Sequence, residues 1–324
     1  MVQEIKPVAD RVMQGGTITF PEAERFIGLE GWADVLELAA QATRIREQFT
    51  GNEVDLCALV NAKAGQCPED CKFCSQSSHW NTGISTYSLM EPDRIVERAN
   101  QAKRFGAKRF CIVTATRGLA DKDLPVICEA VRRVKEEVGI VPECSLGFVT
   151  EGQLKALREA GMTRYNHNLE TSESHFPNIC TAHTYQDRLN TLKMLRQGGV
   201  EICSGGILGL GESRKERLEL AFALAELDVE CAPINVLNPR PGTPLESATS
   251  PDPREVIKTI AVFRFILPRA RLELGGGREV NLKDFQAMAF LAGANSLIIG
   301  GYLTTHGRQP AQDMQMLKDL GFTI

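Results

Sequence analysis

Residues 54–74 read VDLCALVNAKAGQCPEDCKFC and hold both a candidate strand and a candidate metal site. The apolar run 54–60 predicts a buried strand. Three thiols, Cys67, Cys71 and Cys74, follow this run within one short loop. In a barrel of parallel strands, the loops after the carboxyl ends of the strands build the active site. We therefore expect these thiols at the mouth of such a barrel.

Seven further apolar runs follow along the chain, and amphipathic helix-like patterns separate them. Several of these patterns end on glycine, which is a common C-terminal stop of helices. Strand and helix repeated in this way predict an α/β fold of the closed (β/α)8 TIM-barrel type. We expect a helical N-terminal extension over residues 1–50 and the barrel domain over residues 51–324. The seven runs are 109–115, 140–146, 163–169, 200–206, 231–237, 270–274 and 295–300.

Composition excludes several classes of function. The net charge of -4 gives no electrostatic case for binding nucleic acid or an anionic membrane surface. No apolar run is long enough to cross a membrane, and residues 1–16 lack the apolar core of a signal peptide. We therefore expect a cytoplasmic protein. In a reducing compartment, clustered cysteines are more often metal ligands than disulfides, and scattered ones are more often core residues.

The three clustered thiols are soft ligands that suit zinc or an iron–sulfur cluster. A structural zinc site needs four protein ligands and leaves no open position. The nearest spare donor, His79, does not have the spacing of a zinc finger. A cluster with one iron left open for a substrate is the better fit. A non-catalytic zinc or iron–sulfur protein remains the alternative from another class.

Three single cysteines lie on three different predicted strands: Cys111, Cys144 and Cys203. Inward side chains of different strands converge inside a barrel, so these thiols can meet although they are far apart in sequence. Each of them taken alone is equally typical of a buried structural thiol. Cys57, Cys128 and Cys231 are interpreted as core thiols.

The loop Cys-x3-Cys-x2-Cys, with Phe73 before its last cysteine, resembles the signature of the radical S-adenosylmethionine (SAM) superfamily. The resemblance implies that Cys67, Cys71 and Cys74 hold a [4Fe-4S] cluster and that SAM binds its fourth iron. Transfer of one electron then cleaves SAM to a deoxyadenosyl radical that abstracts hydrogen from a substrate C–H bond.

Five segments in sequence order resemble the biotin synthase family within that superfamily. The resemblance implies conversion of dethiobiotin to biotin, with sulfur donated by an auxiliary iron–sulfur cluster inside the barrel. It also implies that Cys111, Cys144 and Cys203 hold this auxiliary cluster. The segments are NAKAGQCPEDCKFCSQSS (61–78), YNHNLETS (165–172), CSGGILGLGE (203–212), PINVLNPRPGTPLE (233–246) and AGANSLIIGGYLTT (292–305).

One segment departs from the family, whose members complete the auxiliary cluster with an arginine in a segment R-[LI]-S-x-G-R-E. Here residues 271–279 read RLELGGGRE, which places Glu273 at the arginine position and Arg271 two residues earlier. Cys180 is an additional thiol where many relatives have none. Either a two-residue shift restores Arg271 as the ligand, or the cluster site has changed, and Cys180 is either a further ligand or a thiol that packs near the mouth of the barrel. The resemblance also implies a class of the family whose auxiliary cluster is of the [4Fe-5S] type, and the changes at Glu273 and Cys180 favour this class over the [2Fe-2S] alternative.

The resemblance also assigns the remaining site residues. It implies that SAM contacts Phe73, Asn168, Glu170, Gly205, Ile207, Gly209 and Glu212. It implies that dethiobiotin contacts Asn166, Asn168, Asn235, Thr304 and Thr305. Taken alone, glycine-rich turns and loop hydroxyls are common and carry little weight. His167 is interpreted as a packing residue, and no catalytic side chain beyond the cofactor ligands is expected.

The resemblance implies a flavodoxin or ferredoxin as electron donor and iron–sulfur assembly proteins that rebuild the cluster. It is compatible with a homodimer. Other radical SAM enzymes that mature cofactors or rearrange amino acids share the barrel and the cysteine loop, so a different substrate remains the second alternative.

Overall fold

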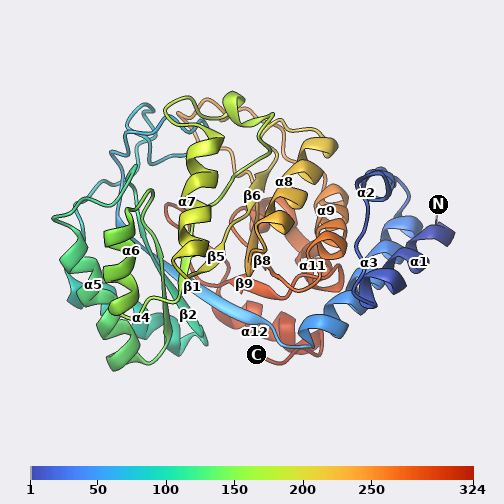
Figure 1. The fold of residues 1–324 in the computed structure, drawn as a ribbon, viewed down its shortest axis with the longest axis horizontal. Coiled ribbons are helices and arrows are strands. Elements are labelled where there is room, and N and C mark those ends of the chain that lie inside the picture. The colour runs from blue at the N-terminus through green and yellow to red at the C-terminus, as the bar shows by residue number, and fades with distance from the viewer. Residues whose placement is uncertain (1) are drawn as a thin grey trace.

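The computed structural model describes residues 2–324 and contains a closed barrel of parallel strands (Figure 1). Neighbouring strands pair in the order β5-β4-β3-β2-β1-β9-β8-β7-β6, and a further pairing of β5 with β7 closes the ring. Strands β5 and β6 are two pieces of one barrel strand that Ser204 and Gly205 interrupt, so the strand positions number eight, which confirms the predicted barrel. The strands are β1 (Asp55–Lys63), β2 (Arg109–Thr114), β3 (Val141–Ser145), β4 (Arg164–Asn166), β5 (Glu201–Cys203), β6 (Gly206–Leu208), β7 (Cys231–Val236), β8 (Arg271–Leu274) and β9 (Ser296–Ile298).

Helices follow the strands and surround the barrel. Several begin with a capping box, in which a threonine or serine and a residue of the first turn satisfy each other's backbone N–H groups. The helices of the barrel are α4 (Pro92–Arg104), α5 (Leu124–Arg133) with η1 (Val134–Val138), α6 (Glu151–Glu159), η2 (Phe176–Asn178), α7 (Tyr185–Gln197), α8 (Arg214–Glu226), α9 (Pro253–Ile266), α10 (Arg278–Asn281), η3 (Lys283–Phe285), α11 (Gln286–Leu291) and α12 (Pro310–Asp319).

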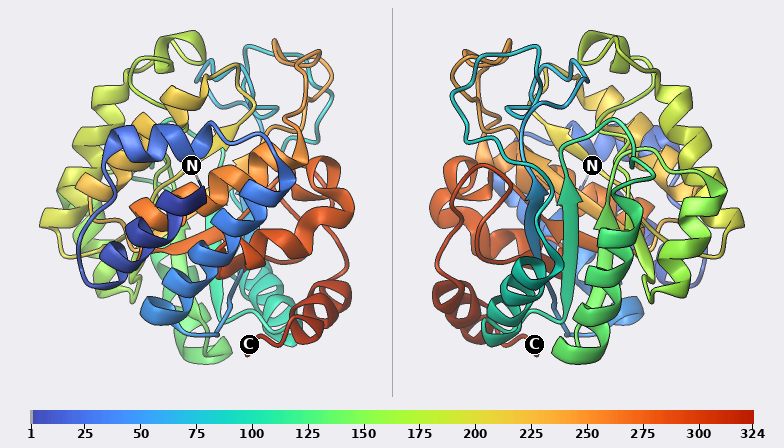
Figure 2. Two further views of the ribbon diagram at one scale, coloured as in Figure 1. Left: turned by 90° about the vertical axis from the view of Figure 1, so that its right-hand side faces the viewer. Right: turned by 90° about the vertical axis from the view of Figure 1, so that its left-hand side faces the viewer.

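Three helices precede the barrel: α1 (Val2–Met13), α2 (Phe20–Ile27) and α3 (Trp32–Thr50). They lie together on one side of the molecule, where α2 and α3 pack against α9 (Figure 2). The Phe26 and Phe265 rings meet edge to face at 5.6 Å between centroids. The division of the chain at residue 50 stays a prediction. No helix in the described range 2–324 is long and apolar enough to cross a membrane.

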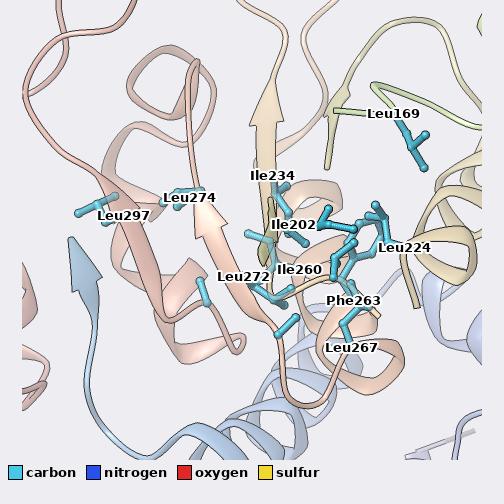
Figure 3. Close-up of a cluster of buried hydrophobic side chains, with 14 of the residues drawn as sticks. Leu169, Ile202, Leu224, Ile234, Ile260, Phe263, Leu267, Leu272, Leu274 and Leu297 are labelled. Carbon is cyan, nitrogen blue, oxygen red and sulfur yellow. The ribbon is translucent and has the colours of Figure 1, made fainter. Parts of the chain in front are cut away.

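The main apolar core lies between the barrel and its helices. On β7 and β8, the outward side chains Ile234 and Leu272 face Ile260 and Phe263 of α9, and Leu274 lies further along the outer side of β8 (Figure 3). All five are at least 97% buried, and burial of one such side chain stabilises the fold by about 1.5–3 kcal/mol. This layer fixes which strand faces point outward, and therefore which side chains point into the barrel.

The barrel interior near the amino ends of the strands is charged. Arg109 pairs with Asp55 at 2.7 Å and with Glu143 at 3.2 Å. Arg164 pairs with Glu143 at 3.1 Å and with Glu201 at 2.9 Å. Buried charges are tolerated only when they are paired, and this network pairs them across β1, β2, β3, β4 and β5. The opposite end of the barrel carries the cysteine loop.

Candidate iron–sulfur active site

The cysteine loop after β1 is ordered by its own backbone. The Cys67 N–H donates to the Gln76 carbonyl at 3.0 Å, and the Cys74 N–H donates to the Cys71 carbonyl at 3.0 Å. Phe73 is half-buried and packs against the core. Burial raises the pKa of Cys67 and raises that of Cys74 to about 11. These soft donors therefore become thiolates only where a metal compensates for desolvation, which fits an iron–sulfur cluster.

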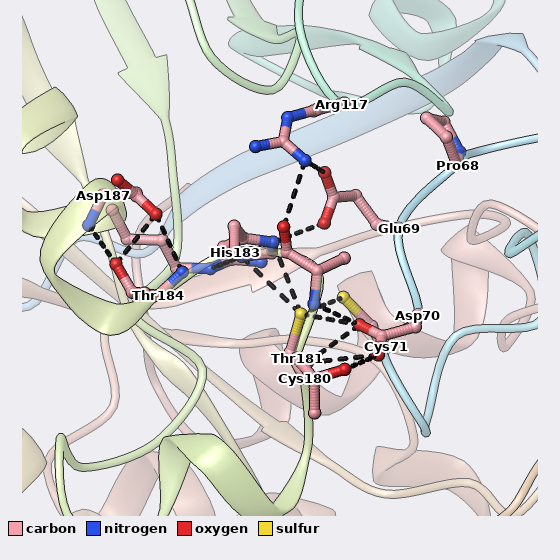
Figure 4. Close-up of polar contacts among 12 residues, drawn as sticks. Pro68, Glu69, Asp70, Cys71, Arg117, Cys180, Thr181, His183, Thr184 and Asp187 are labelled. Atoms are coloured by element: carbon pink, nitrogen blue, oxygen red, sulfur yellow. Dashed lines mark hydrogen bonds and ion pairs between the residues drawn. The ribbon is translucent and has the colours of Figure 1, made fainter.

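Asp70 anchors the loop to the segment between β4 and α7. Its carboxylate accepts hydrogen bonds from the Thr181 and Ala182 N–H groups, both at 2.9 Å, and from the Thr181 hydroxyl (Figure 4). The Lys72 N–H donates to the Ile179 carbonyl at 2.9 Å. The segment 176–184 therefore forms one wall of the thiol site.

Cys180 lies on this wall and not inside the barrel. Its sulfur is 3.8 Å from that of Cys71 and 3.3 Å from Nδ1 of His183 (Figure 4). Hydrogen bonds from Cys71 and His183 lower the pKa of Cys180 to about 5 although burial opposes this. The structure therefore separates Cys180 from the auxiliary region where the sequence predicted it, because the β4–α7 segment folds over the cysteine loop.

The polar stripe at the end of β4 lies beside the glycine-rich segment. Asn168 Oδ1 accepts a hydrogen bond from the Gly205 N–H at 3.1 Å. Glu170 adopts a left-handed backbone with φ of 70°, and its backbone pairs with that of Gly206. A non-glycine residue in this region is uncommon and is found most often at functional sites. Burial raises the pKa of Glu170, although Arg188 lies at 3.7 Å.

Two buried oxygens of this stripe have no hydrogen-bond partner within residues 2–324: Oδ1 of Asn166 and Oε2 of Glu170. Buried polar atoms are rarely left unpaired unless a ligand or water satisfies them. These atoms fit the hydroxyl and amide groups of SAM and of a cyclic urea, which are the ligands expected here.

The glycine-rich segment forms a tight turn. Gly209 has φ of 96°, and its N–H donates to the Glu212 carboxylate at 2.9 Å. Glu212 also pairs with Arg217 at 2.7 Å. This ion pair holds the carboxylate in place and so stabilises the turn. Ile207, on β6, donates its N–H to the Glu170 carbonyl at 2.9 Å, which joins the two predicted SAM segments.

A cavity of 290 Å³ opens inside the barrel between these elements. Asn235 lies in its wall, where Oδ1 accepts the Gly276 N–H at 2.8 Å. Thr304 also lines the cavity, and its hydroxyl lies 3.0 Å from that of Ser75. The cavity thus joins the predicted substrate residues to barrel thiols. Its lining includes Cys57, Cys111, Asn166, Asn168, Asn235, Glu273, Thr304 and Thr305.

Cys144 does not face this cavity. On β2 and β3, Cys111 pairs with Glu143, whereas Cys144 pairs with Ile112. Paired residues of parallel strands share a face, so Cys111 and Glu143 point inward while Cys144 points outward into the apolar layer. The structure therefore places Cys111 and Cys203 inside the barrel. Cys144 lies one residue after the inward position on β3, so its side chain is separated from them.

Arg271 and Glu273 both lie on β8 but at different depths. Arg271 pairs with Asp55 at 2.9 Å at the amino end of the strands and is 40% exposed. Glu273 is buried in the cavity wall, and its oxygen lies within 4.8 Å of the Cys203 and Cys231 sulfurs. Burial, and then Glu143, raises the pKa of Glu273 to about 7. Of the two alternatives that the sequence left open, Glu273 lies beside the Cys203 and Cys231 thiols, whereas the Arg271 guanidinium pairs with Asp55.

Two family models match most of the chain. The Radical SAM superfamily matches residues 63–224, and the Biotin and Thiamin Synthesis associated domain matches residues 233–323. The solved structures of methylornithine synthase (PylB) and of the FeFe-hydrogenase maturase HydG from Carboxydothermus hydrogenoformans are similar at TM-scores of 0.85 and 0.83. Their identities are 21% and 19%, and they cover 98% and 99% of this chain and 96% and 79% of their own. Identities this low support the fold alone.

Full-length relatives carry the family assignment. Proteins named biotin synthase from Geotalea daltonii and Carboxydothermus hydrogenoformans are 46% and 47% identical to this chain. Both matches cover 100% of this chain, and they cover 98% and 100% of the relatives. The chain therefore belongs to the biotin synthase family of the radical SAM superfamily.

Proposed function

We propose that this chain converts dethiobiotin into biotin by radical insertion of sulfur. The observation that carries the proposal is the single cavity that runs from barrel thiols, Cys57 and Cys111, to the predicted substrate residues Asn235 and Thr305. A sulfur donor and an organic substrate must be adjacent for insertion, and this cavity offers a place for both.

The family implies a [4Fe-4S] cluster and SAM. When bound, the cofactors would supply the abstraction of two hydrogen atoms from dethiobiotin, which consumes two electrons and two SAM molecules. They would also supply one sulfide. Formation of its two C–S bonds would return two electrons to cluster iron. Cys67, Cys71 and Cys74 would hold the first cluster on the loop that Asp70 anchors.

The protein's own residues position the ligands and exclude water. Asn168 and Glu170, held beside Gly205 and Gly206, would contact SAM between the cysteine loop and the cavity. Asn166 and Asn235 would pair with the cyclic urea, because an amide side chain offers both a donor and an acceptor. Thr304 and Thr305, which line the cavity, would bind the carboxylate of dethiobiotin.

For the sulfur donor, the proposal is an auxiliary [4Fe-5S] cluster rather than a [2Fe-2S] cluster. Glu273 replaces the arginine ligand here, and a carboxylate is no substitute for a guanidinium in charge or geometry. The proposal predicts about eight irons per chain after anaerobic reconstitution, against about six with a [2Fe-2S] cluster. A flavodoxin or ferredoxin donor, repair by assembly proteins and a homodimer remain predictions.

The test is product mass. The protein is reconstituted anaerobically with iron and ³⁴S-labelled sulfide, and then given SAM, a reductant and dethiobiotin. Biotin carrying the heavy isotope is the expected product, and protein reconstituted with unlabelled sulfide is the control. Formation of deoxyadenosine without biotin would contradict dethiobiotin as the substrate and would show that the chain catalyses another radical SAM reaction. A colourless, zinc-loaded protein that cleaves no SAM would overturn radical chemistry altogether.

A further inference from the structure

We propose that four thiols, Cys57, Cys111, Cys203 and Cys231, are the auxiliary-cluster ligands of this chain, and that Cys144 is not one. The inference deepens the proposed function, on which it rests, because it names the protein ligands of the cluster that would donate sulfur. Two of these thiols were interpreted from the sequence as core residues.

The pairing register places all four thiols on the inner face of the barrel. Leu59 of β1 pairs with Cys111 of β2, so Cys57, two residues earlier on β1, points to the same side. Across the barrel, Cys203 of β5 pairs directly with Cys231 of β7. Cys57 and Cys111 line the cavity, and Glu273 lines it beside the other two thiols.

The thiols are linked through close neighbours. Asn166 Nδ2 lies 2.8 Å from the Cys111 sulfur, and Asn166 pairs in register with Cys203. The Cys203 and Cys231 sulfurs and one Glu273 oxygen lie within 4.8 Å of one another. Cys111, Glu143 and Glu273 are ionisable neighbours of Cys57. One group of donors therefore extends around the interior from β1 to β8.

The chemistry of this group suits iron and sulfide. All ten cysteines of the chain are free thiols, and these four are at least 95% buried. Each thiol would release its proton to solvent as it binds iron. Arg164 of the charged network is an ionisable neighbour of Cys203 and Cys231, while its own charge is paired with Glu143 and Glu201.

Cys144 has different surroundings. It is fully buried between the outward residues Ile112 and Tyr165, and Cys128 of the outer helix α5 is one of its ionisable neighbours. The inward position on β3 is occupied by Glu143 instead. Cys144, which the resemblance gives as a cluster ligand, thus lies one residue away from the inward position on β3. Cys57 and Cys231 would supply donors in its place.

The test isolates the auxiliary cluster by replacing Cys67, Cys71 and Cys74 with alanine. In that background Cys57→Ser, Cys231→Ser, Cys144→Ser and Cys180→Ser are each reconstituted, and iron, sulfide and Mössbauer spectra are recorded. We expect about four irons in the parent and in the Cys144→Ser and Cys180→Ser variants. We expect loss of most of this iron, or a changed spectrum, in Cys57→Ser and Cys231→Ser.

The circular dichroism spectra and urea-unfolding midpoints of the same serine variants, with the cysteine loop intact, report on folding. Loss of the auxiliary iron in Cys144→Ser would overturn the inference. Full iron with an unchanged spectrum in either Cys57→Ser or Cys231→Ser would also overturn it. Failure to form biotin would contradict the proposed substrate and leave these iron counts unaffected, so the two failures are distinguishable.

Discussion

Thr304 and Thr305 are adjacent in sequence but differ in their surroundings. The Thr304 hydroxyl lies 3.0 Å from Ser75, whereas the Thr305 hydroxyl has no such partner within the described residues 2–324. If both face the carboxylate of dethiobiotin, Thr305 has the hydroxyl that is free to donate to it. A hydrogen bond to a charged group contributes about 1.5–3 kcal/mol.

We therefore expect Thr305→Val to raise the KM for dethiobiotin by about tenfold or more. Thr305→Ser keeps the hydroxyl and should retain most of the affinity, which makes it the matched control. Steady-state biotin formation at varied dethiobiotin concentration measures the effect. Equal KM values for the valine and serine variants would contradict a hydrogen bond from Thr305.

Asp70 shows how one carboxylate can hold a cofactor loop in place. It accepts two backbone hydrogen bonds from residues 181 and 182 across the site. We expect Asp70→Asn to loosen the loop, because the amide nitrogen cannot accept the hydrogen bonds that the second carboxylate oxygen takes from the Thr181 hydroxyl and N–H. The lifetime of the loop's cluster during exposure to a chelator should then be shorter. Bleaching of the iron–sulfur absorbance measures this lifetime.

Asp187 offers a control for that experiment. Its carboxylate likewise accepts a backbone N–H, that of Thr184 at 2.8 Å, but it caps α7 and does not contact the cysteine loop (Figure 4). Asp187→Asn should therefore leave the bleaching rate near that of the parent. Equal acceleration in both variants would show that the Asp70 effect is general destabilisation.

At the level of elements, the interruption between β5 and β6 is what allows the barrel to close. A Cβ atom at Gly205 would lie 2.0 Å from the Pro233 carbonyl oxygen, which belongs to the backbone of β7 and cannot move independently. Glycine at this position therefore lets two backbones approach closely while the chain passes from β5 to β6.

We expect Gly205→Ala to lower the free energy of unfolding by about 3 kcal/mol, because the methyl group overpacks a closed interface. Gly152→Ala is the control, since the nearest atom to a Cβ at this exposed position in α6 is 3.9 Å away. Urea unfolding of both variants measures the difference. Similar midpoints for the two variants would contradict the clash.

At the scale of the whole molecule, the N-terminal helices cover the helix α9, which is buried on nearly every side. Eleven of the fourteen residues of α9 are buried, including Lys258, which donates to the Leu29 carbonyl at 2.7 Å. The barrel supplies one partner for α9, and α2 and α3 supply the other.

We expect a chain that begins at residue 51 to aggregate or to unfold at much lower urea concentration than the full chain. Removal of α2 and α3 exposes side chains such as Phe265, and the lost burial is comparable with the whole stability of a domain, about 5–15 kcal/mol. Size-exclusion chromatography and circular dichroism measure the outcome. A monomeric fragment with an unchanged midpoint would show that the barrel folds independently of residues 1–50.

The barrel, the place of the cysteine loop and the family could be predicted from local signals in the sequence. Eight apolar runs separated by helical patterns are local signals, and each run coincides with a strand position. The motif after β1 is likewise contiguous, so its three thiols could be recognised without knowledge of any other element.

The tertiary structure alone decided which distant thiols and charges face one another. A shift of one residue on a strand reverses the direction of a side chain, and composition gives no signal of that shift. For this reason Cys144 turns outward while Cys57 and Cys231, which resembled ordinary core residues, turn inward. The position of Cys180 beside the cysteine loop has a related cause, because the path of a loop depends on its contacts with the rest of the fold.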